Sequence, residues 1–511
     1  MSQDAGAELK DVELNELDPE KQPMKAAGEE EAAGEQNGCV KVKMPEEAEA
    51  KFTGLSKEEL LKVAGTPGWV RTRWALLVLF WLGWVGMLVG AVVIIVQAPR
   101  CRPLPPMRWW NEGPLYEIGD PQAFVADKQK PALQAMEDHI NSLSQLKIKG
   151  LVLGSLHKAP TDSETDLSLD AVDGSLGTLD NFKSFVSKAQ GKGISVVVDL
   201  TPNYRGQMPW YSDKFLQDPS QQAKIKGAVD FWLGLGVKGI QLSGLDHLVD
   251  KAPALWEELW NKTKWEGSEP ADRVLIGVTA LNQSDKIMEL QNRTQVDLLL
   301  SGLLRLNQDA LDLSVAVEAL LTGLNQSRMS WNVGGRSAGH LASLVPQRLV
   351  RLYHLLLFTL PGTPVFNYGD EIGLQDEQGK PFPRMLWNES QDTADTVQKG
   401  RLALRDLFRE LSELRGRERS LEHGDFRPLR LACPASLAFL REWDQSERYL
   451  ALLNFANQSA PCGLAGEVGL PRAASVVLST GPGRARDQQL ELADLRLEPS
   501  EGLLLRFPYT P

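Results

Sequence analysis

The residues that most often carry chemistry in proteins are few in this chain and follow no metal or phosphate motif. The four cysteines lie far apart, so no pair has the CxxC spacing of a zinc site. The six histidines include no HExxH pair, and there is no GxxxxGK[ST] phosphate loop. We therefore expect neither a metal ion nor a cofactor. The net charge of −12 argues against a nucleic-acid partner.

One segment is long and apolar enough to cross a membrane. Residues 74–96 are 23 residues without a charge, and as a helix they would span about 34 Å, enough for a hydrocarbon core of roughly 30 Å. The segment has no polar face, unlike the core helix of a soluble protein, and it lies too far from the N-terminus for a cleaved signal peptide. Five basic residues precede it within 51–73 and three follow it within 97–108. This balance predicts an uncleaved signal-anchor with a cytoplasmic N-terminus.

Glycosylation sequons support the same orientation. The span is followed by 14 asparagines, of which about two would begin an N-x-S/T sequon by chance. Six do so, and none precedes the span. We therefore expect an extracellular C-terminal part on a single-pass type II protein of the plasma membrane. The sequons begin at Asn261, Asn282, Asn292, Asn325, Asn388 and Asn457.

The composition divides the chain into six regions. Residues 1–50 hold fourteen Asp and Glu against five Lys and Arg and have no aromatic residue, which predicts a disordered cytoplasmic tail. Ser56 and Glu59 have the spacing of a capping box, which predicts a short helix before the span. Prolines after the span predict a stiff, non-helical stalk. The predicted regions are the tail at 1–50, a juxtamembrane helix at 51–73, the anchor at 74–96, the stalk at 97–108, a barrel at 109–416 and a β domain at 417–511.

Strand-length and helix-length apolar patterns alternate after the stalk. Amphipathic segments such as 131–146, 179–190 and 220–235 separate many of the strand candidates. Eight strands alternating with helices predict an α/β fold of the (β/α)8 TIM-barrel type. After about residue 416 short β segments, such as 449–455 and 502–507, predict a C-terminal antiparallel β-sandwich. The barrel candidates are 115–118, 148–153, 194–200, 237–242, 274–278, 296–300, 329–332 and 364–368.

Three segments give this barrel a family resemblance. Residues 146–156 (LKIKGLVLGSL) resemble the second strand of the α-amylase family of retaining glycosidases. Residues 177–203 resemble its third strand and end in the family's Asp-x-x-x-Asn at Asp199 and Asn203, and residues 360–374 (LPGTPVFNYGDEIGL) resemble its eighth strand. The resemblance extends from about residue 109 to the C-terminus and implies the family's barrel.

The family's catalytic carboxylates have no counterpart at the matching positions. A retaining glycosidase needs a nucleophile and an acid/base carboxyl group about 5 Å apart. The resemblance matches Ser243 to the nucleophile and Val278 to the acid/base. Gln241, two residues before Ser243, stands where the family has an arginine. No base that would activate Ser243 is evident. We interpret Asp199 as a structural residue inherited with the fold; the alternative, Asp246 as a displaced nucleophile, would still lack an acid/base. We expect no enzyme activity.

A narrower resemblance extends over the whole chain. Residues 51–101, which contain the span, and the acidic opening at 11–17 are similar to the heavy subunits of heteromeric amino-acid transporters. The resemblance implies a glycoprotein that one disulfide joins to a multi-span light chain. The heavy subunit brings the light chain to the plasma membrane and stabilises it there, and the light chain carries the transport path. The resemblance also implies association with β-integrins in adhesion signalling.

The position of each cysteine bears on this reading. Cys101 lies five residues beyond the predicted span, where an unpaired cysteine in an oxidising compartment favours an intermolecular disulfide. A free or palmitoylated thiol is the alternative, although palmitoylation is expected on the cytoplasmic side. Cys39 should be reduced in the tail. Cys433 and Cys462 both fall in the β domain, where the sequence leaves their pairing open.

Small residues within the span suggest a second contact. Gly83, Gly86 and Gly90 fall on roughly one helical face, where another transmembrane helix could approach closely. Glycine is also simply common in such helices. The rest of the span contacts membrane lipid, and one apolar helix has no polar lining for a solute. A transport role for this chain therefore requires a partner.

Two other functions remain open at this point. One is a membrane-anchored α-glucosidase with displaced catalytic groups, which glycoside turnover would support. The other is a carbohydrate-binding or adhesion receptor built on the inactive barrel, which glycan binding without a co-purifying multi-span protein would support. The transporter subunit is the leading hypothesis because it alone uses the anchor, Cys101 and the emptied site together.

Overall fold

The computed structural model divides the chain into two compact units, Met1–Ala98 and Pro99–Pro511. The tail predicted at 1–50 lies outside the residues that the structure describes, and each unit is treated by itself. The described residues are 56–97, 101–125, 130–158, 160–164, 166–266, 269–304, 310–336, 338–378, 382–387, 396–431, 435–464 and 467–510.

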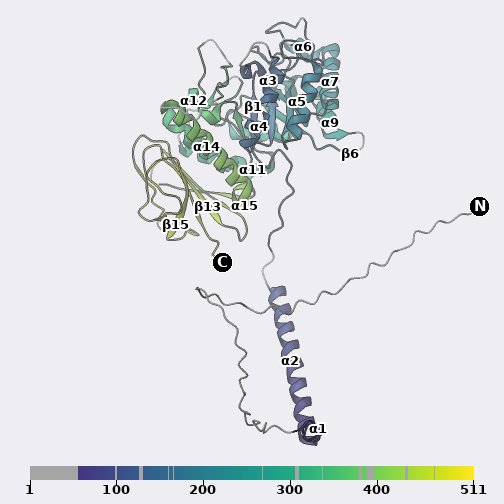
Figure 1. The fold of residues 1–511 in the computed structure, drawn as a ribbon. Helices are drawn as coiled ribbons and strands as arrows, with labels where there is room; N and C mark the ends of the chain where they lie inside the picture. Colours follow the sequence, from purple (N-terminus) through teal and green to yellow (C-terminus); the bar gives the residue numbers. More distant parts are fainter. Residues whose placement is uncertain are drawn as a thin grey trace, which may run out of the picture. The chain divides into compact units, whose positions relative to one another are not determined.

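The first unit contains a short helix, α1 (Lys57–Ala64), and a long helix, α2 (Pro67–Gln97) (Figure 1). The Ser56 side chain accepts from the backbone of Glu59, and the Glu59 side chain accepts from the backbone of Ser56, which is the predicted capping box. Gly65 ends α1, and Pro67 occupies the first turn of α2, where its missing N–H costs nothing. The long helix therefore begins earlier than the predicted span, and residues 67–73 belong to it. Among the described residues, α2 is the one helix long and apolar enough to cross a membrane.

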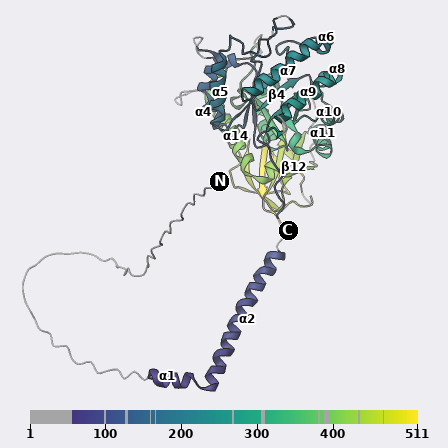
Figure 2. The same ribbon diagram turned by 90° about the vertical axis from the view of Figure 1, so that its right-hand side faces the viewer.

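The second unit begins with a parallel barrel. Its eight strands follow the order β8-β7-β4-β3-β2-β1-β10-β9, and a parallel bridge between Leu299 and Met329 closes the circle. Figure 2 shows helices around the outside of these strands. The strands are β1 (Leu115–Ile118), β2 (Gly150–Leu153), β3 (Ser195–Asp199), β4 (Gly239–Ser243), β7 (Val274–Val278), β8 (Leu298–Leu300), β9 (Ser330–Trp331) and β10 (Thr363–Asn367); a small hairpin, β5 (Trp265–Glu266) and β6 (Glu269–Pro270), precedes β7.

All eight predicted strands are present within a few residues of the predicted bounds. The helix predicted at 131–146 is instead two helices that break at His139, where the backbone (φ −94°, ψ 2°) departs from helical geometry. The helices are α3 (Ala132–Asp138), α4 (Ile140–Gln145), α5 (Leu179–Gln190), α6 (Asp213–Gln217), α7 (Pro219–Gly234), α8 (Leu245–Lys251), α9 (Pro253–Lys264), α10 (Ser284–Thr294), α11 (Ala310–Gly323), α12 (Leu341–Leu344), α13 (Val350–Thr359), α14 (Thr396–Arg417) and α15 (Arg419–Glu422), with 3-10 turns η1 (Pro121–Phe124), η2 (Gln326–Arg328), η3 (Gln347–Leu349) and η4 (Asp370–Ile372).

Two layers of apolar side chains hold the barrel together. Side chains that alternate along each strand point to opposite faces, so one set fills the barrel and the other packs under the helices. The interior set is closed at one end by Trp110, which precedes β1. This interior contains Leu115, Val152, Val197, Val274, Ile276, Leu298, Leu300 and Val365.

The C-terminal region forms an antiparallel sheet in the order β11-β12-β13-β18-β15-β16, and a two-stranded sheet, β14-β17, accompanies it. The predicted antiparallel β domain is therefore present, but it is built on one six-stranded sheet, and its other sheet is a single strand pair. Its own apolar core includes Leu440, Leu452 and Leu505. The strands are β11 (Asp425–Leu429), β12 (Ser436–Glu442), β13 (Arg448–Asn454), β14 (Ala460–Pro461), β15 (Ala473–Ser479), β16 (Gln489–Glu491), β17 (Arg496–Leu497) and β18 (Gly502–Phe507).

Helix α13 joins the barrel to the β domain. Nearly every side chain of this helix is buried, as expected of a helix that is apolar on all sides and packed on all sides. Tyr353 contacts Phe455 of the β domain with ring centroids 5.6 Å apart. On β18, a Cβ atom at Gly502 would lie 2.9 Å from the Leu355 side chain, so the close approach of strand and helix depends on glycine there.

Two buried arginines cap the C-terminal end of α13. The last carbonyl groups of a helix have no partner within it. Arg415 of α14 donates to the carbonyls of Phe358 (2.7 Å) and Leu360 (2.8 Å). Arg441 of β12 donates to Thr359 (2.6 Å) and also to the carbonyl of Gly424 (2.9 Å). Burial lowers the pKa of the Arg415 guanidinium to about 10, so it stays charged at neutral pH. Both domains thus share one set of charge-assisted hydrogen bonds.

We expect Arg441→Ala to lower the free energy of unfolding of the second unit by about 3–5 kcal/mol, because it leaves buried carbonyls without donors. Thermal and denaturant unfolding followed by tryptophan fluorescence would measure the loss. The control is Arg472→Ala in the same β domain, since the Arg472 side chain is 90% exposed and should change stability by less than about 0.5 kcal/mol. Equal effects of the two variants would contradict the role assigned to Arg441.

Candidate functional site

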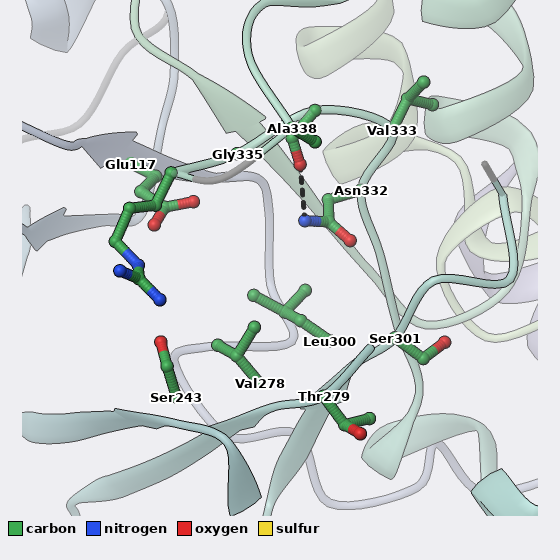
Figure 3. Close-up of a pocket in the computed structure, with 12 residues that line it drawn as sticks. Glu117, Ser243, Val278, Thr279, Leu300, Ser301, Asn332, Val333, Gly335 and Ala338 are labelled. Carbon is green, nitrogen blue, oxygen red and sulfur yellow. Dashed lines mark hydrogen bonds between the residues drawn. The ribbon is translucent and has the colours of Figure 1, made fainter. Parts of the chain in front are cut away.

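A small cavity lies at the C-terminal ends of the barrel strands, where enzymes of this architecture place their active sites. Its volume is about 40 Å³, whereas pockets for small molecules are roughly 300–1,000 Å³. It has room for a few water molecules but not for a sugar ring. Figure 3 shows the residues around it. The lining consists of Glu117, Ser243, Val278, Thr279, Leu300, Ser301, Asn332, Val333, Gly334, Gly335, Arg336 and Ala338.

Ser243 and Val278, the two predicted positions of the missing carboxyl groups, lie side by side. They are the last residues of β4 and β7 and are register partners in the parallel ladder, so their backbones are about 4.8 Å apart. Figure 3 shows both side chains projecting toward the cavity. Carboxyl groups at these two positions would have the spacing of a retaining glycosidase. The hydroxyl and isopropyl groups that stand there offer neither a proton donor of suitable pKa nor a carboxylate nucleophile.

The surroundings of Ser243 hold its backbone. Its N–H donates to the Thr201 hydroxyl (2.8 Å), and its carbonyl accepts from the indole of Trp210 (2.8 Å). Asp246, the alternative nucleophile, lies in α8 and accepts from the Thr279 hydroxyl (2.7 Å). Asp246 does not line the cavity. The described hydrogen bonds therefore place no base on the Ser243 side chain.

Asp199 is buried beneath the cavity instead of lining it. Its carboxylate accepts from the backbone N–H of Thr201 (2.8 Å) and from the side-chain amide of Gln241 (2.9 Å). Burial raises its pKa, and the nearby charge of Arg336 opposes that rise. Asn203, the other retained family residue, joins two loops, because its amide donates to Asp162 (2.9 Å) and to the carbonyl of Met208 (2.8 Å). The hydrogen bonds of Asp199 and Asn203 thus hold neighbouring strands and loops in place.

Glu117 is a site residue that the sequence analysis missed. Only 5% of its surface is exposed, and it shares the amide of Gln241 with Asp199, at 3.3 Å from its own carboxyl group. Burial, together with the charge of Asp199, raises the pKa of Glu117 to about 7. A single acidic residue within the apolar strand Leu115–Ile118 was the signal that could have identified it. Gln241 thus replaces the family's arginine with a neutral bridge between two buried carboxyl groups.

Cys101 and the described sequon asparagines lie on accessible surface, whereas Cys462 is buried. Cys101 is exposed and has no disulfide partner among the described residues, and Cys462 is buried in the β domain. Cys39 and Cys433 lie outside the described residues, so the pairing of Cys433 with Cys462 stays open. Asn388 also lies outside them. The remaining sequon asparagines, all exposed, are Asn261, Asn282, Asn292, Asn325 and Asn457.

The predicted glycine face of the span is open in this unit. No atom outside α2 lies within 4 Å of a Cβ built at Gly83, Gly86 or Gly90. The transmembrane packing predicted for these three residues stays a prediction.

The amino-acid sequence matches those of known transporter heavy chains. Residues 40–116 match a family model described as the solute carrier family 3 member 2 N-terminus. The chain is 47% identical over 537 residues to the amino acid transporter heavy chain SLC3A2 of Oryctolagus cuniculus, covering 100% of both chains. It is 47% identical over 538 residues to that of Rattus norvegicus, again covering 100% of both.

Solved structures match the second unit. A trehalose-6-phosphate hydrolase of Bacillus licheniformis is similar with a TM-score of 0.62 at 13% identity, covering 79% of this chain and 100% of that one. At this identity the likeness concerns the fold alone, and it confirms the predicted glycosidase-like barrel.

We expect Glu117→Gln to stabilise the protein at pH 8 but not at pH 5. The ordinary pKa of a glutamate is 4.5, and the folded chain raises that of Glu117 to about 7. The unfolded chain therefore ionises at lower pH than the folded chain does, and the free energy of unfolding falls as the pH rises from 4.5 to about 7. Removing the ionisable group should add about 1–3 kcal/mol at pH 8. Unfolding curves at both pH values would measure this difference.

The matched control is Glu258→Gln, because the Glu258 side chain is 52% exposed. Burial also raises the pKa of Asp370 to about 8 and of Glu371 to about 7. These two groups contribute pH dependence of the same sign in every variant. A pH profile of Glu117→Gln that runs parallel to the wild-type profile would contradict the assignment.

Proposed function

Because the chain belongs to the SLC3A2 amino acid transporter heavy chains, we propose that it is the non-catalytic heavy subunit of a heteromeric amino-acid transporter. A disulfide from Cys101 joins it to a multi-span light chain, which it brings to the plasma membrane and stabilises there. The observation that carries this proposal is the full-length similarity to heavy chains, and the exposure of Cys101 supports the covalent link.

The single span supports the division of labour between the subunits. Helix α2 is apolar throughout its membrane-length part, and one helix cannot enclose a polar path for an amino acid. The light chain therefore carries the substrate. The N-terminus is cytoplasmic and the C-terminal unit extracellular, as the basic residues before the span and the sequons after it favour. The five described sequon asparagines are exposed, which glycosylation requires.

The barrel acts as a platform instead of an enzyme. Two observations support this part of the proposal: Ser243 and Val278, which the family resemblance matches to the catalytic carboxyl groups, are neighbours at the strand ends, and the cavity there is too small for a sugar. The association with β-integrins is proposed from the family resemblance.

The covalent link predicts a specific electrophoretic result. On a non-reducing gel the wild-type chain should run in a larger complex that dithiothreitol dissociates, and Cys101→Ser should run alone. Cys39→Ser is the control, because the tail cysteine should remain reduced. Mass spectrometry of the complex in mild detergent should identify a multi-span protein. A larger band that persists in Cys101→Ser would refute the proposed link.

The platform role predicts that the purified protein does not hydrolyse an aryl α-glucoside above the rate in buffer. The carboxyl pair that stabilises the transition state is absent, and a serine without a base cannot replace it. Turnover that Asp199→Asn abolishes would instead support the α-glucosidase hypothesis. Glycan binding at the strand ends, without a co-purifying multi-span protein, would support the receptor hypothesis.

A further inference from the structure

The residue that follows Cys101 is held by the β domain. The backbone N–H of Arg102 donates to the carboxylate of Asp444 (3.0 Å). The Arg102 guanidinium donates to Asp425 (3.2 Å), and it lies over the indole of Trp443, 4.4 Å from the ring centroid. These three contacts engage both the backbone and the side chain of Arg102. We call Asp425, Trp443 and Asp444 the Arg102 platform.

The Arg102 platform is itself firmly built. Trp443 is 4% exposed, its backbone N–H donates to the Ser420 hydroxyl (3.2 Å), and its carbonyl accepts from Ser446 (2.9 Å) in the turn between β12 and β13. Asp444 occupies that turn with φ +42°. A tryptophan packed at the end of a sheet gives a flat surface of fixed orientation, which suits the planar guanidinium group.

The chain beyond Arg102 is fixed at a second point. The prolines of this segment favour an extended, stiff backbone. At its far end, the Asn111 side chain donates to the carbonyl of Ser327 (2.7 Å) and to the Thr363 hydroxyl (3.1 Å) on the barrel. Between these points the chain borders a cavity of about 570 Å³, which parts of the barrel and of the β domain also line; the stalk residues that line it are Arg102, Pro103, Pro105, Pro106 and Met107. Residues 103–106 between these points are exposed, so the described part of the stalk is held to the folded unit at its two ends.

We propose that Arg102 is a positioning residue that fixes Cys101 beside the turn between β12 and β13, so that the β domain sets where the intersubunit disulfide forms. This inference rests on the proposed function, because it assumes that Cys101 joins the light chain. Holding one thiol in place raises its effective concentration at the partner thiol and thereby the rate of pairing. Without these contacts the thiol would move with a loose tether.

The inference predicts that Arg102→Ala slows disulfide formation without unfolding the protein. The full chain would be expressed in mammalian cells, pulse-labelled, and trapped with N-ethylmaleimide at successive times. The measured quantity is the fraction of chain in the dithiothreitol-sensitive complex with the cell's own light chains. We expect the initial rate to fall by about threefold to tenfold. Arg102→Lys should fall between wild type and Arg102→Ala, because it keeps the charge but loses the planar contact with Trp443.

Two further variants test the mechanism. Arg108→Ala is the matched control, because Arg108 belongs to the same stalk and makes only an exposed ion pair with Asp272 (3.5 Å); it should pair at the wild-type rate. Asp425→Ala should slow pairing, and adding it to Arg102→Ala should have little further effect, since both remove the same contact.

Three results separate the possible outcomes. A complex that persists in Cys101→Ser would refute the proposed function, and the inference with it. A complex that depends on Cys101 but forms equally fast in Arg102→Ala and Arg108→Ala would overturn the inference alone. An Arg102→Ala melting temperature lowered by more than about 4 °C would also overturn it, since Arg102 would then act on folding.

Discussion

The C-terminal end of α13 is the point on which the rest of the second unit depends. Helix α13 is surrounded by protein, so water cannot satisfy its last carbonyl groups. Arg415 and Arg441 do so instead, one from the helix that ends the barrel region and the other from the β domain. A guanidinium group is suited to this role because it offers several donors in one plane. The arrangement makes the two domains a single structural unit.

Because the two domains form one unit, the C-terminal β domain can hold the start of the stalk, which precedes the barrel in the sequence. The Arg102 platform includes Trp443 and Asp444, directly after the strand that carries Arg441. The same strand therefore holds the end of α13 and presents the surface for the stalk. If Cys101 joins a light chain as proposed, this arrangement favours the reaction, because the thiol is then held by a rigid domain and does not move on a flexible tether.

The barrel keeps its fold with a serine and a valine at the neighbouring strand ends Ser243 and Val278. The residues that fill the barrel interior form one apolar cluster, and Val278 at the end of β7 packs against it, so an apolar side chain at that strand end adds to the packing. Buried acidic groups are costly when ionised, and Gln241 moderates that cost for Asp199 and Glu117 by donating to both. The indole of Trp210 donates to the carbonyl of Ser243. The cavity beside Ser243 at the strand ends is small.

The sequence by itself determined the elements of the fold, and it predicted which catalytic carboxyl groups are missing. The charge-free run and the eight alternating strands could be identified because they depend on local pattern. The roles assigned to Ser243 and Val278 come from family motifs and stay predictions. The tertiary structure alone decided that the charge of Glu117 faces that of Asp199, that two arginines cap α13, and that Arg102 lies on Trp443. Each of these contacts joins residues far apart in the chain, and no local periodicity encodes such a meeting. The physical reason is that hydrogen bonds and burial act between whichever groups the fold brings together, whereas sequence patterns report only on neighbours.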